Sequence, residues 1–254
     1  MPDRRDTVSL RVATFNIRSG RSLDGWRAWP LRRRATLRAI VGLDADVIGL
    51  QEVYAFQLRW LRRHLPDYEF VRGDGRSRRR RGEHCPLLVR RGVVALMSAA
   101  TRWYGDAPDT AGTRLPGATA PRIATVAAMV VSGRTVQVLN THLDEHIAGH
   151  RLRSATQLLG WLVPGTPAIV LGDMNAPLGD PALVALADGD LRPALRGDEG
   201  GTAHDFTGRR DGPQIDHVFT SREWDVGRVT VGGEHWVGRW PSDHWPVVAD
   251  VVLR

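Results

Sequence analysis

The stretch Pro241-Ser242-Asp243-His244-Trp245-Pro246 places an acid and an imidazole directly before a β-like run over residues 247–253. Earlier in the chain, Gly172-Asp173-Met174-Asn175 follows another β-like run, over residues 168–171. Carboxylates, amides and imidazoles at strand ends are a common way for a rigid scaffold to present a site to solvent. Further strand ends of the same kind occur along the chain.

The apolar pattern predicts strands that sometimes alternate with helices and sometimes follow one another directly. Strands are expected over residues 10–15, 46–50, 85–89, 123–131, 135–139, 168–171 and 247–253, with a further pair from residue 215 onward. Helices are expected over 31–43 and 54–65, and around Leu152, Ala155, Leu159 and Leu162. This mixture favours an α/β (α+β) fold with mixed sheets and helices outside.

Length and composition favour one large domain. The apolar fraction is 42% and the charged fraction 25%, which suits a soluble globular enzyme rather than a disordered chain. No linker-like stretch divides residues 1–254, so we expect a single domain in which residues 1–8 are flexible.

Charge and cysteine content bear on partners and compartment. The formal net charge is +7, and every one of the 35 basic residues is arginine, so a polyanionic partner is favoured. The single cysteine, Cys85, excludes an intrachain disulfide and favours a reducing compartment. The N-terminus has no apolar signal region, and no segment is long enough to span a bilayer. We therefore expect a cytoplasmic monomer without a transmembrane segment.

The polar residues at the strand ends are of the types that bind hard cations. The carboxylates of Glu52 and Asp243 and the amide oxygen of Asn16 suit Mg²⁺ or Mn²⁺. A zinc site is disfavoured because the chain has no cysteine pair and no two histidines at zinc-ligand spacing on a helix. The remaining candidates are Glu83, Arg122, Asn140, His142, Asp173, Asn175, Asp216 and His244.

Two separate histidines near acids allow two different roles in one site. One imidazole can activate water while the other stabilises a leaving or non-bridging oxygen. A carboxylate paired with such an imidazole selects its tautomer and supports its charged form. Together with a metal, amide donors and an arginine, this set describes the hydrolysis of a phosphoester.

Six short strings make a family resemblance specific. They are Thr14-Phe15-Asn16, Leu50-Gln51-Glu52, Asn140-Thr141-His142, Gly172-Asp173-Met174-Asn175, Ile215-Asp216-His217 and Ser242-Asp243-His244. In this order they resemble the motif set of the endonuclease/exonuclease/phosphatase superfamily, which includes pancreatic-type deoxyribonuclease, abasic-site endonucleases, neutral sphingomyelinases and inositol-polyphosphate 5-phosphatases. The resemblance runs from about residue 10 to the C-terminus. It implies a four-layer sandwich, in which two mixed β-sheets pack together with helices outside.

The resemblance also implies a role for each matching residue. Glu52 would be the principal metal ligand, supported by Asn16 and Asp243. His244 would be the general base, oriented by Asp216, and His142 would contact the scissile phosphate, steadied by Glu83. Asp173 and Asn175 would lie between metal, water and phosphate, and Arg122 would face the phosphate.

Two further strings resemble a compact bacterial branch of the superfamily whose substrates are poorly defined. They are residues 82–90 and 201–208. Asn16 is followed by Ile17-Arg18, whereas abasic-site endonucleases typically carry an aspartate two residues after this asparagine. The departure argues against a dedicated abasic-site repair enzyme.

Each string also has a structural explanation when taken alone. Gly172-Asp173-Met174-Asn175 makes a good turn, and an isolated His142 is more often a core histidine than a catalyst. Such an explanation is adequate for any one string but not for all six together, because six independent coincidences in the family order are improbable. For His84, His146, His204 and His217 the structural explanation is preferred.

The sequence therefore predicts a divalent-metal-dependent phosphoester hydrolase, foremost a nuclease-type phosphodiesterase that uses water activated by His244. The net charge and the arginine-rich run at residues 76–81, just before Glu83, favour nucleic acid. A phosphatase or phosphodiesterase for a small or lipid-linked phosphate, such as an inositol phosphate or sphingomyelin, remains the alternative. A catalytically silent polyanion-binding module is a further alternative, which the intact set of site residues disfavours.

Overall fold

The structure is a computed structural model that describes residues 8–77, 81–232 and 238–254. Two six-stranded sheets form its centre. The first sheet consists, in spatial order, of β11 (Trp224–Val231), β12 (Val247–Leu253), β1 (Val8–Asn16), β2 (Val47–Gln51), β4 (Leu87–Arg90) and β3 (Tyr68–Val71). The second consists of β5 (Val94–Trp103), β6 (Ile123–Val131), β7 (Arg134–His142), β8 (Ala168–Asp173), β10 (Asp216–Ser221) and β9 (Leu191–Pro193).

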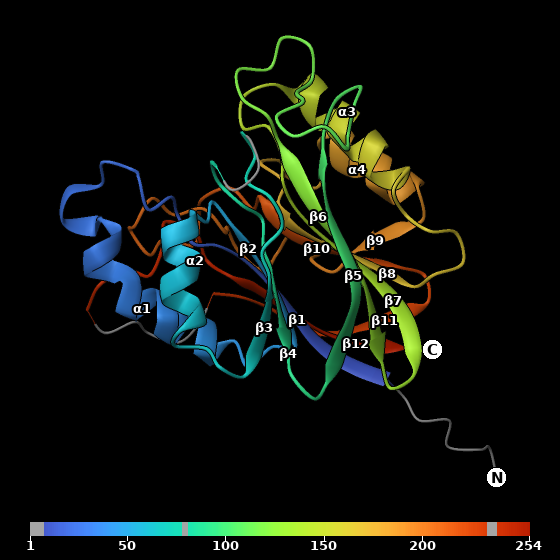
Figure 1. The fold of residues 1–254 in the computed structure, drawn as a ribbon, viewed down its shortest axis with the longest axis horizontal. Coiled ribbons are helices and arrows are strands. Elements are labelled where there is room, and N and C mark those ends of the chain that lie inside the picture. Colours follow the sequence, from blue (N-terminus) through green and yellow to red (C-terminus); the bar gives the residue numbers. More distant parts are fainter. Residues whose placement is uncertain (1–7, 78–80, 233–237) are drawn as a thin grey trace.

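The helices lie on the outer faces of the two sheets. They are the short 3-10 helix η1 (Gly25–Arg27) and the α-helices α1 (Trp29–Gly42), α2 (Ala55–Arg62), α3 (Ala148–Leu159) and α4 (Pro181–Asp188). In Figure 1, α1 and α2 cover the first sheet, and α3 and α4 cover the second. This arrangement confirms the expected four-layer sandwich. Among the described residues, no helix combines the length and the apolar composition that crossing a membrane requires.

Three apolar clusters separate the four layers. Val12 and Val138 belong to the cluster between the two sheets. Their chain neighbours point the other way: Ala13 packs beneath α1 and α2, and Leu139 packs beneath α3 and α4. Successive side chains of a strand point to opposite faces, so these central strands are apolar on both sides.

The strand register gathers polar residues at one edge of the sandwich. β1 runs parallel to β2 with Asn16 opposite Gln51, and β7 runs parallel to β8 with His142 opposite Asp173. β10 runs antiparallel to β8, so its first residue, Asp216, lies opposite the last residue of β8. The carboxyl ends of parallel strands meet the amino ends of antiparallel neighbours at this edge.

The two sheets approach closely beside that edge. A Cβ atom at Gly49 of β2 would lie 1.9 Å from Leu171 Cδ1 in the opposite sheet, so a larger residue there would displace the side chains of Leu171 and Asn140. Asn140 donates from Nδ2 to the carbonyls of Leu50 and Pro86 at 2.9 and 2.8 Å, and its Oδ1 accepts from Gln51 Nε2 at 2.6 Å. Asn140 therefore links the sheets rather than facing substrate.

The predicted elements are all present, with shifted ends, but η1, β3, β5, β9 and α4 were not predicted. β5 is an edge strand rich in alanine, serine and threonine, most of which are partly or fully exposed, so it lacks an apolar pattern. α4 begins with a readable signal, because Asp180 accepts from Ala182 N–H and Pro181 follows it. Val8, which was expected in a flexible stretch, begins β1 and pairs with Leu253 of β12. Residues 1–7 of that stretch lie outside the described ranges.

Candidate active site

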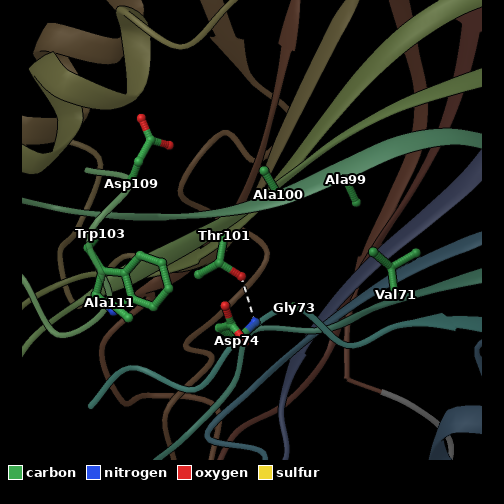
Figure 2. Close-up of a pocket in the computed structure, with 9 residues that line it drawn as sticks. All are labelled: Val71, Gly73, Asp74, Ala99, Ala100, Thr101, Trp103, Asp109 and Ala111. Atoms are coloured by element: carbon green, nitrogen blue, oxygen red, sulfur yellow. Dashed lines mark hydrogen bonds between the residues drawn. The ribbon is translucent and has the colours of Figure 1, made fainter. Parts of the chain in front are cut away.

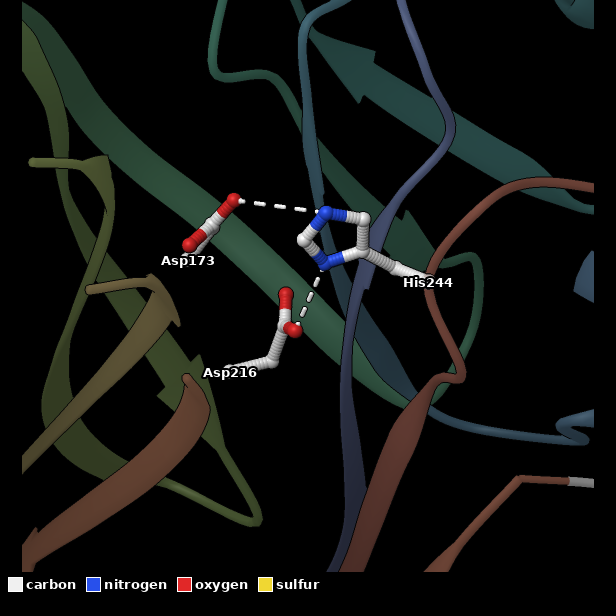
Figure 3. Close-up of side chains that lie close together, drawn as sticks. All are labelled: Asp173, Asp216 and His244. Carbon is white, nitrogen blue, oxygen red and sulfur yellow. Dashed lines mark hydrogen bonds and ion pairs between the residues drawn. The ribbon is translucent and has the colours of Figure 1, made fainter. Parts of the chain in front are cut away.

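His244 and Asp216 form the most direct polar pair at the site edge. His244 Nδ1 donates to Asp216 Oδ2 at 2.8 Å, and Asp216 is fully buried. The other ring nitrogen, Nε2, lies 4.0 Å from Asp173 Oδ2 (Figure 3). Thr202 positions Asp216, because the backbone N–H of Asp216 donates to the Thr202 hydroxyl at 3.0 Å. The pair has the geometry expected of a general base with its orienting acid.

His142 approaches the same carboxylate from β7. Its Nε2 lies 3.5 Å from Asp173 Oδ2, and the side chain is 9% exposed. Asp173 therefore stands between two imidazoles, one from each side of the site. Burial, together with the positive charges of Arg122 and Arg76, lowers the pKa of His142 well below its ordinary value. His142 is thus neutral at physiological pH and can donate one hydrogen bond.

The carboxylates shift the proton affinities of their neighbours. Burial and the like charge of Asp216 raise the pKa of Asp173 to about 7. Burial also lowers the pKa of His244, but the charges of Asp216, Asp173 and Asp243 together outweigh it and hold that pKa well above the ordinary value. The site therefore concentrates negative charge and favours cationic groups.

Asn16 joins Glu52 to this cluster. Its Nδ2 donates to Glu52 Oε1 at 3.0 Å and to Asp173 Oδ2 at 2.9 Å. Its Oδ1, the atom expected to face a metal, instead accepts the backbone N–H of Arg18 at 2.9 Å. Ser19 N–H donates to Glu52 Oε2 at 2.6 Å. In this structure Asn16 orients the two carboxylates through its amide nitrogen.

The backbone is constrained at two of these positions. Glu52 and Asn175 both have positive φ angles, 62° and 49°. Such conformations cost energy for residues other than glycine and often occur at functional sites. Asn175 is held by its neighbours, because its N–H donates to Asp173 Oδ1 at 3.0 Å and its Nδ2 donates to the Leu143 carbonyl at 3.1 Å.

Gly172, the residue before Asp173, is required by sterics. Its φ is +153°, and a Cβ atom there would lie 2.1 Å from the carbonyl oxygen of Thr141 in β7. The close approach of β7 and β8 at this point brings His142 and Asp173 together.

Asp243, expected near the metal, is paired with an arginine. Arg18 Nη1 lies 3.1 Å from Asp243 Oδ2, and Arg18 Nη2 lies 3.1 Å from Asp24 Oδ1. Ser242 Oγ donates to the Asn16 carbonyl at 2.6 Å, which ties the loop of Asp243 to the end of β1. Asp243 therefore lies close to Asn16 while its carboxylate balances Arg18.

Arg32 of α1 is a positioning residue that the sequence analysis did not identify. Its side chain is fully buried, and Nη1 donates to the carbonyls of Ile17 at 2.6 Å and Pro241 at 3.0 Å. Its Nη2 donates to the carbonyl of Arg18 at 2.8 Å. Arg32 thus joins the loops that carry Asn16 and Asp243. Within a run of three consecutive arginines, only the helical phase of the apolar residues could have singled it out.

Glu83 and Arg122, the two residues expected to bind substrate, each lie beside a residue of opposite charge. Glu83 Oε2 is 2.9 Å from Arg76 Nη1, while burial raises the pKa of Glu83. Arg122 is largely buried, and its Nη2 lies 3.9 Å from Glu145 Oε1. The polar neighbour of His142 is Asp173, so the expected support of His142 by Glu83 remains a prediction. In the arginine-rich run, residues 78–80 lie outside the described ranges.

The donor set fits a divalent cation. Within the described residues, ligand atoms of Asp173, Asp216 and His244 lie within 4.8 Å of one another. Among the residues that the structure describes, the buried Asp216 Oδ1 has no hydrogen-bond partner, and the amide of Asn16 links Glu52 to Asp173. Buried carboxylates this close repel one another unless a proton or a cation lies nearby. Oxygen donors of this kind select hard cations.

The site, together with the fold, defines the class of protein. The family model described as the Endonuclease/Exonuclease/phosphatase family matches residues 13–244. The chain belongs to this family, whose members are phosphoesterases, and is an enzyme of that class. No curated protein sequence matches it significantly.

Solved structures are similar over nearly the whole chain. An endonuclease/exonuclease/phosphatase from Bacteroides vulgatus has a TM-score of 0.90 and 29% identity, covering 97% of this chain and 99% of its own. A mannosyl-6-phosphatase from Bacteroides thetaiotaomicron has a TM-score of 0.86 and 26% identity, covering 96% and 100%. D. rerio TDP2 in complex with a single-strand DNA product has a TM-score of 0.76 and covers 96% and 98%, and at 16% identity it shares the fold.

Proposed function

We propose that this protein is a divalent-metal-dependent phosphodiesterase of nuclease type. The observation that carries the proposal is the His244–Asp216 pair, whose free ring nitrogen faces Asp173 across 4.0 Å at the edge where Asn16 and Glu52 also lie. A base, its orienting acid and a carboxylate cluster within one edge are the parts that metal-assisted hydrolysis requires.

The roles follow from which atoms are free. A cation bound beside the carboxylates that raise the pKa of His244 would lower that pKa and favour the neutral imidazole. Because His244 donates from Nδ1 to Asp216, Nε2 of the neutral ring would then take a proton from the attacking water. Asp173 Oδ2, near that nitrogen, and the constrained Asn175 orient the water. His142 is neutral and donates toward the phosphate oxygens, and the charge of Arg122 stabilises the same group.

Glu52 would hold Mg²⁺ or Mn²⁺, with Asp243 and Asn16 beside it. When bound, such a cation polarises the phosphoryl oxygens as a Lewis acid. Asn16 and Ser19 fix both oxygens of Glu52 at 3.0 and 2.6 Å, so this carboxylate is positioned before any ligand arrives. Positioning of this kind lowers the cost of assembling the site.

Nucleic acid is the proposed substrate class because the chain carries a formal net charge of +7. Positive charge attracts a polyanion and releases its counterions. The second candidate is a phosphatase for a small phosphate, which the similarity to the mannosyl-6-phosphatase supports at 26% identity. The single cysteine, Cys85, is buried, which is consistent with the cytoplasm that we propose as the compartment.

A substrate panel tests the proposal. Plasmid DNA, single-stranded DNA, RNA, inositol phosphates, mannose 6-phosphate and a chromogenic diester are each incubated with Mg²⁺, with Mn²⁺ and with excess EDTA. The proposal expects metal-dependent cleavage of a polynucleotide and of the chromogenic diester. Turnover restricted to phosphate monoesters would support the phosphatase instead, and full activity in EDTA would exclude both.

A further inference from the structure

A hollow lies next to the edge of the sandwich that carries the candidate active site. It has a volume of about 450 Å³ and is lined mainly by Arg21, Tyr54, Phe56, Arg59 and Arg81. This is within the range of pockets that hold small ligands. We call it the arginine–aromatic pocket.

The walls of this pocket continue directly from site residues. Tyr54 is two residues beyond Glu52, and Arg81 is two residues before Glu83. Arg21 follows the loop in which Ser19 donates to Glu52, and its own N–H donates to Ser19 Oγ at 3.2 Å. A group bound in the pocket would therefore belong to the same substrate as a phosphate at the catalytic edge.

The pocket walls are fixed to one another by Gln57. This buried side chain accepts the N–H groups of Gly20 and Tyr54 at Oε1, both at 2.9 Å. Its Nε2 donates to the Arg18 carbonyl at 3.1 Å. The loop after β1 and the start of α2 are thus joined before a ligand binds, which reduces the entropy lost on binding.

The pocket offers positive charge and ring faces together. The rings of Tyr54 and Phe56 stack at 6.1 Å with an angle of 23°, and the Arg21 guanidinium lies 4.9 Å above the Tyr54 ring. Over the described ranges, Arg21, Arg59 and Arg81 form no ion pair, in contrast to Arg18 and Arg76, which pair with carboxylates of the site. Their charge is available to an anionic ligand.

Another hollow, larger than the arginine–aromatic pocket, has the opposite character. It measures about 530 Å³ and lies where β3 and β5 form the edges of the two sheets (Figure 2). Its lining includes Asp74 and Asp109 beside small residues, and Thr101 accepts the Asp74 N–H at 2.6 Å. Asp109 is already paired with Arg102, and the lining residues named for this hollow include no arginine that could attract a polyanion.

We infer that the arginine–aromatic pocket binds the nucleotide next to the scissile phosphate of a single-stranded nucleic acid. The base stacks on the ring faces of Tyr54 and Phe56, and the arginines contact its phosphate. Stacking on an aromatic side chain requires an unpaired base, which excludes an intact duplex at this position. The inference rests on the proposed function, because it assigns the substrate class of the same site.

Binding without turnover provides the first test. A fluorescein-labelled oligothymidine is titrated with protein in EDTA at several salt concentrations, and anisotropy gives the dissociation constant. Arg21→Gln and Arg59→Gln should each flatten the slope of log K against log salt by about 0.7, the value for one phosphate contact on a single strand. Phe56→Ala should weaken binding about tenfold, as expected for loss of a base–aromatic stack. Arg153→Gln, an exposed substitution on α3, should leave both quantities unchanged.

Turnover separates this inference from the proposed function. In the presence of Mg²⁺, the ratio of kcat/KM on the oligonucleotide to kcat/KM on the chromogenic diester should fall about tenfold in Phe56→Ala and Arg59→Gln. If the wild type cleaves oligonucleotides but the variants keep its binding and its ratio, the pocket assignment is wrong and the proposed function stands. If the variants lose binding as expected while the wild type cleaves no phosphoester, the proposed function is wrong and the pocket stands.

Discussion

His244 and Asp216 lie 28 residues apart in the chain, yet Nδ1 of the imidazole is 2.8 Å from Oδ2 of the carboxylate. Two antiparallel pairings bring them together. β10 begins at Asp216 beside the end of β8, and His244 stands just before β12, which pairs with β1. The catalytic role proposed for His244 depends on this register.

Loss of the base should nearly abolish turnover. His244→Ala should lower kcat by about two to four orders of magnitude, the usual contribution of a general base. Asp216→Asn should lower kcat by the same factor or a smaller one. The double variant should lower kcat no more than the more damaging single variant does, because the pair acts as a unit. Steady-state kinetics on the chromogenic diester measure all three. His146→Ala, which removes an exposed imidazole, is the control, and an equal loss there would undermine the assignment.

Removal of metal should stop the reaction. Excess EDTA should abolish turnover, and added Mg²⁺ or Mn²⁺ should restore it, because hard cations select the oxygen donors at this edge. Glu52→Gln should weaken metal binding by at least about tenfold in calorimetric titration, the scale of losses reported when the surroundings of a metal site are altered. Glu223→Gln, in the turn between β10 and β11, provides a carboxylate control. Unchanged affinity in Glu52→Gln would assign the metal to other ligands.

Arg32→Met should destabilise the fold. The change removes three charged hydrogen bonds and leaves the Ile17 carbonyl without this donor, while Gln57 and Thr36 still donate to the carbonyls of Arg18 and Pro241. We expect a loss of about 2–4 kcal/mol in the free energy of unfolding, measured by urea titration. Arg34→Met, an exposed change on the same helix, should stay within about 0.5 kcal/mol of the wild type. Equal stability of the two variants would show that the buried guanidinium contributes little.

A methyl group at Gly172 should disturb the site edge. Gly172→Ala places a Cβ atom 2.1 Å from the Thr141 carbonyl oxygen and forces the backbone from a φ of +153°. We expect the free energy of unfolding to fall by about 2–4 kcal/mol because of overpacking and backbone strain. Gly149→Ala in α3 is the matched control, because in the described part of the chain no atom beyond its neighbours and its own helix backbone lies within 4 Å of the added Cβ. That change should raise the free energy of unfolding by at most about 1 kcal/mol. In thermal unfolding, Gly172→Ala should melt below the wild type and Gly149→Ala above it.

His84 should make stability depend on pH. Burial lowers its pKa from the ordinary value of 6.5, and its Nδ1 lies 3.0 Å from the Val53 carbonyl oxygen. Because the unfolded chain takes up the proton first, stability is complete above about pH 6.5 and falls as the pH drops below it. Urea unfolding at pH 7.5 and 5.5 should show a smaller loss in His84→Asn than in the wild type. Identical losses would mean that other groups account for the acid sensitivity.

Much of the fold could be predicted because its signals are local. The alternation of apolar residues along 247–253 and 123–131 marks strands that the structure contains as β12 and β6. β5 could not be predicted in this way, since an exposed edge strand of small residues needs no apolar face. Most of the candidate site residues could be predicted because they stand at or next to the end of a strand, where their position follows from the strand itself, whereas Glu83 lies four residues before β4.

Short stretches of sequence specify the strand ends and the motifs in family order, and so indicate which candidate residues gather at one edge of the sandwich. What each of these residues contacts depends on the tertiary structure. It turned the amide nitrogen of Asn16, rather than its oxygen, toward Glu52 and Asp173, and it paired Asp243 with Arg18. It also buried Arg32 between two loops. These contacts depend on sheet register and on loops that meet from distant parts of the chain, and no local pattern specifies such distances.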